Sequence, residues 1–158
     1  MNYYDFLYEQ FPELMGNLHA DAKPLWGLMN AQQMIEHLGY IVGFSNGRLE
    51  AKPTADTERL AYRKMRYFEK YVPMTRQIRQ DFLPETPHPV MYPDLESAKN
   101  FLLQQLERFD DYFAEHPQMM TLHPVLGMLN YDEWVEMHAR HFEHHLRQFS
   151  ILPLPIDA

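Results

Sequence analysis

Residues 131–149, YDEWVEMHARHFEHHLRQF, carry most of what the sequence says about the fold. Asn130 followed by Glu133 forms a capping-box pattern, which predicts the start of a helix. Pro153 lies shortly after the stretch and prevents the helix from continuing far beyond residue 149. We therefore expect a long last helix over about 130–149.

One face of this helix is rich in histidine. At ~100° per residue, His138, His141 and His145 fall within about 40° of Trp134, and the charged residues lie mostly on the far side. The face around Trp134 should be buried, so these imidazoles should be buried as well. His144 lies at the edge of that face. Two histidines at i and i+4 lie about one helical turn apart and can bind one ion, although such a pair is equally consistent with a structural role.

Apolar periodicity predicts three further long helices and one shorter helix. They are expected at 3–19, at 30–45, at 55–70 and from 94 to about 116, with residues 117–129 as a loop. Pro12 offers an alternative start for a shorter first helix. The pair Asn30 and Gln33 repeats the capping-box pattern at the start of the second long helix.

The region of residues 47–93 is a proline-rich crossover with one short helix. Two helices, a long crossover and two further helices form one of the known connections of a four-helix bundle. The sequence therefore predicts an all-α four-helix bundle, with the crossover between the second and third bundle helices. The length suits one domain over residues 1–158.

Composition narrows the function classes. The net charge of −8 argues against a nucleic-acid partner, because such binding depends on clustered Lys and Arg. No apolar run approaches the ~20 residues that span a bilayer, and no signal peptide is evident, so we expect no membrane partner and a cytoplasmic protein. With no cysteine, a disulfide, a thiolate metal site and a cysteine nucleophile are excluded.

A third inward histidine favours a metal site over structural histidines. His37 lies beside Met34 and Ile41 on the inner face of the second helix, so it can join His141 and His145. Three nitrogen ligands suit zinc and leave a coordination position open, which is the pattern of catalytic sites. His138 also faces inward and is the rival ligand.

Other side chains near these histidines have weaker claims. Gln33, Tyr40 and Gln148 share the ligand faces and are candidates for orienting a ligand or lining a substrate pocket, although ordinary helix packing is the commoner role for each taken singly. Glu36 and Glu143 point away from the ligands, so no carboxylate is an evident general base. Among the other histidines, His123 is assigned to a loop that lines an entrance, and His88, like His19 and His116, to a solvated or turn position.

The chain resembles the DinB/YfiT-like superfamily of metal-dependent bundles, in the branch called domain of unknown function 1569. The resemblance rests on Trp26-Gly27 followed by AQQMIEHL, on HPVLG, and on HARHFEHHLRQF. It implies a four-helix bundle with a crossover after the second helix. It also implies nickel or zinc held at the positions of His37, His141 and His145. The superfamily commonly has HrGQ at the second ligand of the pair, whereas this chain reads HLRQ, with Leu146 and Arg147.

These features lead to two functional hypotheses. The first is a metal-dependent enzyme acting on a small molecule, either a hydrolase or a transferase that uses a low-molecular-weight thiol, as some relatives in the superfamily do. Zinc or nickel is the expected metal, with iron and manganese as alternatives. The second is a non-catalytic metal- or ligand-binding module. The resemblance also implies a homodimer.

Overall fold

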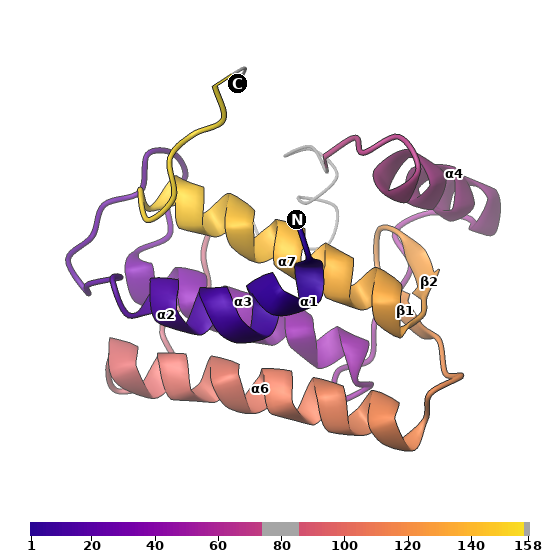
Figure 1. Cartoon of the computed structure of the whole chain (residues 1–158), viewed down its shortest axis with the longest axis horizontal. Coiled ribbons are helices and arrows are strands. Elements are labelled where there is room, and N and C mark those ends of the chain that lie inside the picture. The colour runs from indigo at the N-terminus through magenta and orange to yellow at the C-terminus, as the bar shows by residue number, and fades with distance from the viewer. Residues whose placement is uncertain (74–85, 157–158) are drawn as a thin grey trace.

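The computed structural model describes residues 1–73 and 86–156 and is mostly helical, with one small β-hairpin (Figure 1). The elements are α1 (Tyr3–Asp5), the π-helix η1 (Phe6–Gln10), α2 (Phe11–Met15), α3 (Ala31–Ser45), α4 (Thr57–Phe68), α6 (Leu95–Glu115), β1 (Thr121–His123), β2 (Gly127–Leu129) and α7 (Tyr131–Gln148). The N-terminal helical segment, α3, α6 and α7 run along the long axis, and α4 and the hairpin lie together at one end (Figure 1). Within the described residues, we find no helix of the length and apolar character needed to cross a membrane.

The N-terminal helical segment is shorter than the predicted helix at 3–19. It ends at Met15, and its middle turn is a π-helix that comes just before Pro12. Pro12 has no N–H to donate to the preceding turn, and the wider π-turn accommodates its ring. After Met15 the chain turns, with the Leu18 N–H donating to the Met15 oxygen at 3.1 Å. Leu18 is buried although it lies outside the helix, which is why its spacing misled the prediction.

Both predicted capping boxes are present. The Asn30 side chain accepts the Gln33 N–H at 2.8 Å, and the Gln33 side chain accepts the Asn30 N–H at 2.9 Å. Asn130 and Glu133 repeat the arrangement at 2.9 and 3.0 Å. These reciprocal bonds satisfy backbone donors that have no partner within the helix. They fix the first residues of α3 and α7, which carry the candidate ligands.

Helix α3 is buried along most of its length and packs against both α6 and α7. Its close approach to α6 depends on Gly39. A Cβ atom placed at Gly39 would lie 2.4 Å from the ring of Phe101, which is too short for any real contact. The Phe101 ring is itself stacked on Tyr92, with 4.8 Å between the ring centroids, so it has little freedom to move away.

We expect Gly39→Ala to lower the free energy of unfolding by about 1–2 kcal/mol. Overpacking in a core costs ~1–3 kcal/mol, which outweighs the ~1 kcal/mol that Ala gains in helix propensity. Urea denaturation would measure the change. Gly43→Ala is the matched control, because its nearest neighbour is the flexible end of Arg48. Equal or higher stability in Gly39→Ala would contradict this account of the packing.

The loop predicted at 117–129 contains an antiparallel hairpin, so the all-α prediction is corrected to a mostly helical fold with a small sheet. Thr121 pairs with Leu129, and His123 pairs with Gly127. Each strand has three residues, too few for an alternating pattern to be visible in the sequence. Gly127 adopts a φ of +84°, a backbone conformation that favours glycine.

His123 belongs to this hairpin and does not line an entrance. Its side chain is 1 % exposed, and its Nδ1 accepts the N–H groups of Val125 and Leu126 at 3.0 and 3.2 Å. Burial lowers the pKa of the His123 imidazole to about 3. The neutral ring therefore holds the turn together, much as an Asx side chain holds a turn.

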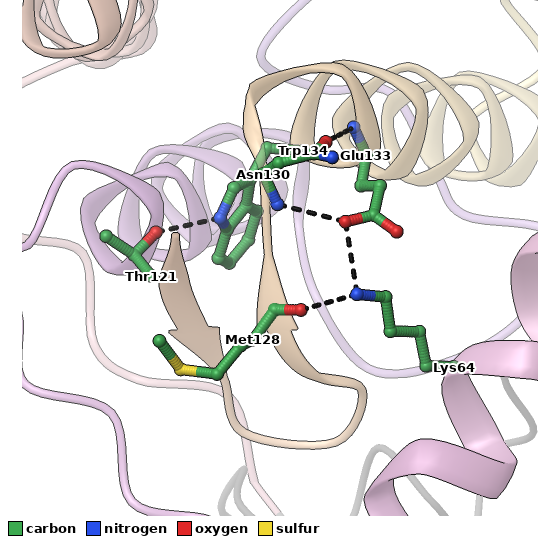
Figure 2. Close-up of polar contacts among 6 residues, drawn as sticks. All are labelled: Lys64, Thr121, Met128, Asn130, Glu133 and Trp134. Atoms are coloured by element: carbon green, nitrogen blue, oxygen red, sulfur yellow. Dashed lines mark hydrogen bonds and ion pairs between the residues drawn. The ribbon is translucent and has the colours of Figure 1, made fainter. Parts of the chain in front are cut away.

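Helix α4, the short helix expected in the crossover, is attached to the hairpin and to α7. Lys64 donates to the Met128 oxygen at 2.7 Å and lies 3.1 Å from the Glu133 carboxylate, which also caps α7 (Figure 2). One turn further along α4, Arg140 of α7 donates to the Tyr67 oxygen at 2.8 Å and lies over the Tyr67 ring. The part of the predicted crossover at 74–85 lies outside the described residues.

Candidate metal centre

Contacts around Ser45 fix how α3 and α7 lie against each other. The Ser45 hydroxyl donates to the Val42 oxygen and accepts from His138 Nε2, at 3.0 Å. Thr121 donates to the Ser45 oxygen at 2.7 Å and accepts the Trp134 indole N–H at 2.8 Å, a contact visible in Figure 2. The last turn of α3 is thus joined to the first half of α7.

This register brings three histidines together. His37 lies about two turns before Ser45, and His141 and His145 lie about one and two turns after His138, so antiparallel packing sets His37 against this pair. The Nε2 atom of His141 is 3.1 Å from that of His37 and 3.1 Å from that of His145. One nitrogen from each ring lies within 4.8 Å of the others. The three histidines are therefore close enough to bind a metal ion.

Gln148 determines which nitrogen of His145 carries the proton. The Gln148 Nε2 donates to the Trp26 oxygen at 2.8 Å, so its Oε1 is the atom 2.7 Å from His145 Nδ1. An amide oxygen only accepts hydrogen bonds, so His145 Nδ1 carries the N–H. In the neutral ring, Nε2 then offers its lone pair toward His141. This is how carbonyl-type partners orient metal-binding imidazoles.

The donor set fits a cation better than it fits hydrogen bonds among the rings. Because His145 Nε2 can only accept, a hydrogen bond there requires His141 Nε2 to donate its single hydrogen. His141 Nε2 then has no lone pair left to accept a hydrogen bond from His37. Two nitrogens that each lie ~2.0–2.1 Å from one ion are about 3.3 Å apart at a tetrahedral angle, close to the 3.1 Å observed.

The loop around Trp26-Gly27 supports Gln148 from the other side. Besides the side-chain bond, the Leu25 N–H donates to the Gln148 backbone oxygen at 2.7 Å. Gly27 adopts a φ of +81°, and a Cβ there would lie 2.9 Å from Gln148 Nε2. The glycine is therefore needed both for the backbone conformation and for the close approach of the amide.

We expect Gln148→Leu to weaken divalent-metal affinity by about 10–100-fold, because the variant leaves His145 without the partner that sets its tautomer. Competition with a chromophoric chelator would measure the affinity. Gln104→Leu, at an exposed position of α6, is the matched control and should bind as wild type. An unchanged affinity in Gln148→Leu would show that this amide does not orient the site.

His138, the rival ligand, lies apart from the three-histidine group. Its ring is fully buried, stacked on Trp134 at 5.2 Å and edge-on to Phe109 at 5.1 Å. Since the Ser45 hydroxyl already donates to Val42, His138 Nε2 carries the hydrogen between the two side chains. Burial lowers the His138 pKa to about 3, with a smaller contribution from His123. His138 therefore serves as a neutral contact between α3 and α7.

Comparison of the sequence with known protein families assigns the chain to one of them. The family model described as "Protein of unknown function (DUF1569)" matches residues 9–151. The chain belongs to this family. No curated protein and no solved structure matches it.

The remaining candidate residues of this DUF1569 chain differ in what they contact. The Gln33 amide is engaged by the Asn30 N–H and by the His88 oxygen, at 2.9 and 3.0 Å. Tyr40 is half-buried, and its ring lies 6.1 Å from that of His88. His144 is exposed, with its ring 5.4 Å from that of Trp26.

Two residues outside the three-histidine group, Glu36 and His88, join α3 to the returning crossover. Glu36 is 9 % exposed and binds the backbone of Met91 and Tyr92 instead of facing solvent. His88 is exposed, as predicted, but it lies beside Tyr40. No periodicity could reveal either contact, because both depend on where the crossover returns to α3.

Proposed function

We propose that the protein is a metal-dependent enzyme that acts on a small molecule at His37, His141 and His145. The observation that carries the proposal is the convergence of three Nε2 atoms, with the tautomer of His145 set by Gln148. Three neutral imidazoles leave the charge of a divalent ion intact, and three protein ligands leave a position for substrate. Zinc or nickel is the proposed metal, with iron and manganese as alternatives.

A divalent ion at this position would supply Lewis-acid activation of a nucleophile or of a substrate oxygen. The chain itself orients the ion's ligands and restricts access. His141 and His145 are buried, at 7 % and 1 % exposed, whereas His37 is half-buried, so solvent reaches the group from the His37 side. Substrate would enter from that side.

The choice between a hydrolase and a thiol-dependent transferase rests on the resemblance to the DinB/YfiT-like superfamily. We propose that the chain is a member of that superfamily and shares its four-helix bundle. The nucleophile is then water or a small thiol. The chain has no cysteine of its own, so a thiol must come from a low-molecular-weight cofactor. Such analogy suggests a reaction class but does not by itself identify a substrate.

A turnover screen tests the proposal. Metal-loaded protein, chelated protein and His141→Ala are compared in two assays: conjugation of electrophiles with several small thiols, and hydrolysis of esters and amides without thiol. We expect metal-dependent turnover in one assay, which also identifies the reaction class. Activity that survives chelation and His141→Ala would place the chemistry elsewhere.

A non-catalytic metal-binding module is the second candidate. The hydrogen bonding of Glu36, the buried carboxylate that precedes His37 in the chain, favours this module. Both of its oxygens accept hydrogen bonds, from the backbone of Met91 and Tyr92 and from the Gln32 amide, so it has no free oxygen to act as a general base. Stoichiometric metal binding without turnover in either assay would support this module.

We further propose that the protein forms a homodimer and binds neither membranes nor nucleic acid. Multi-angle light scattering at micromolar concentration should give a mass near twice the 19.0 kDa of the chain. The expectation comes from related bundles and from an aromatic content of 14 %. A mass of one chain at that concentration would contradict it.

A further inference from the structure

Residues 87–92, here called the strap, are tied to α3 by a buried carboxylate. Glu36 accepts the N–H groups of Met91 and Tyr92 at 2.7 and 3.3 Å. The Gln32 amide donates to Glu36 at 2.9 Å and to the Tyr92 oxygen at 2.7 Å. Burying a carboxylate is costly unless hydrogen bonds compensate for the lost water. The groups that donate to Glu36 belong either to the strap or to Gln32, which itself binds the strap. The strap therefore has a defined position on α3.

The strap leads toward the candidate metal centre. Around α3, Glu36 and Gln32 lie about 100–140° from His37, and they hold the Tyr92 end of the strap. Gln33 and Tyr40 lie only about 40–60° from His37 in the same rotational direction, and they contact the His88 end. From Tyr92 back to His88, the strap thus passes around the helix toward the face that carries His37.

His88 is held at the end of this path. Its backbone oxygen accepts the Gln33 amide at 3.0 Å, and its ring lies 6.1 Å from the Tyr40 ring. Pro87 and Pro89 flank it, and they restrict the backbone on both sides. The side chain itself is exposed. His88 therefore has a fixed backbone and an accessible imidazole. The imidazole lies beside Tyr40, which is one helical turn after His37 on α3.

We propose that His88 and Tyr40 form a hydrogen-bonding subsite for the far end of the substrate, whose near end is held at the three-histidine group. This inference rests on the proposed metal site. A cation at one end and imidazole and phenol donors at the other fit a small molecule with two oxyanion groups, such as two carboxylates. His88 contacts substrate and is not a metal ligand, and Glu36 positions His88 by holding the strap.

Paired probes of different length test the subsite. Cobalt-loaded protein is titrated with acetate, which reaches only the ion, and with malonate, succinate and glutarate, which carry a second carboxylate. The visible spectrum of cobalt reports binding. We expect at least one dicarboxylate to bind about 5–10-fold more tightly than acetate, the gain of one added hydrogen bond. His88→Phe, which keeps an aromatic ring but has no hydrogen-bond donor, should remove this preference and leave acetate affinity and cobalt content unchanged.

Further variants separate a direct contact from a structural effect. Tyr40→Phe should reduce the preference for the dicarboxylate, and His116→Phe, at the exposed end of α6, should not change it. Glu36→Gln should reduce it in the wild-type background but have no further effect in His88→Phe, because Glu36 acts through His88. Circular dichroism checks that each variant is folded.

The outcomes distinguish the subsite from the metal site. If the protein binds no cobalt, the proposed metal site is wrong and the subsite falls with it. If cobalt binds but no dicarboxylate is preferred over acetate, or the preference survives His88→Phe, the subsite alone is overturned. If cobalt content falls in His88→Phe, His88 is a metal ligand and the assignment to substrate is wrong.

Discussion

Replacing His141 with alanine should weaken divalent-metal affinity by more than ~100-fold, because even loss of a partner outside the coordination sphere costs 10–100-fold. His141 is the central ring of the group, with its Nε2 3.1 Å from both His37 and His145. At zinc concentrations of ~1,000 Kd, wild-type protein should gain about 4 kcal/mol in free energy of unfolding, and His141→Ala should lose at least about 2.7 kcal/mol of this gain. Metal analysis and thermal unfolding with and without zinc would measure both effects.

His37→Ala and His145→Ala should behave like His141→Ala. The protein must be purified without a nickel column, so that the bound metal reflects its own preference. His144→Ala is the matched control, because His144 is exposed on the same helix. Near-stoichiometric metal in all three ligand variants would exclude the site. A loss confined to His138→Gln would move the ligand set by one turn of α7.

Metal-free protein should lose stability steeply as the pH falls from about 6.5 toward 3. Burial lowers the pKa of His123 and of His138 to about 3, against an ordinary value of 6.5 in the unfolded chain. Between these values the unfolded chain binds two protons that the folded protein does not take up. Stability is therefore fully present above pH 6.5, and each histidine costs about 1.4 kcal/mol for every pH unit below it.

Urea denaturation at several pH values, in the presence of chelator, would measure this slope. His138→Gln keeps an N–H for Ser45, and His123→Asn keeps an acceptor for the turn, but neither side chain titrates. Each variant should lower the slope of unfolding free energy against pH by about 1.4 kcal/mol per pH unit, which corresponds to one proton. A wild-type slope in both buried variants would show that other groups control acid unfolding.

Patterns that repeat every few residues were sufficient for the helices after the first. Two capping boxes placed the starts of α3 and α7 correctly, because Asn30 and Asn130 bond backbone groups only three residues away. Helical spacing also identified His37, His141 and His145 as a group that lies close enough to bind a metal. The first helix was predicted too long, because Leu18 is buried by packing and not by helical periodicity.

Features that join distant parts of the chain could not be predicted in this way. The strands of the hairpin are three residues long, so their pairing leaves no recognisable alternation. Sequence spacing put His138 on the same inward face as His141 and His145 and left it as a rival ligand. The contact between His138 and Ser45, which lie 93 residues apart, sets His138 apart from that group.

The sequence by itself determined which residues form α3 and α7 and which of their faces carry histidine, because capping and periodicity are local properties of the chain. The tertiary structure decided how α3 and α7 are aligned, which tautomer His145 adopts through Gln148 and Trp26, and where Glu36 places the strap. Each of these depends on a hydrogen bond between segments far apart in the chain. The geometry of such a bond exists only after the helices have packed, so no local pattern encodes it.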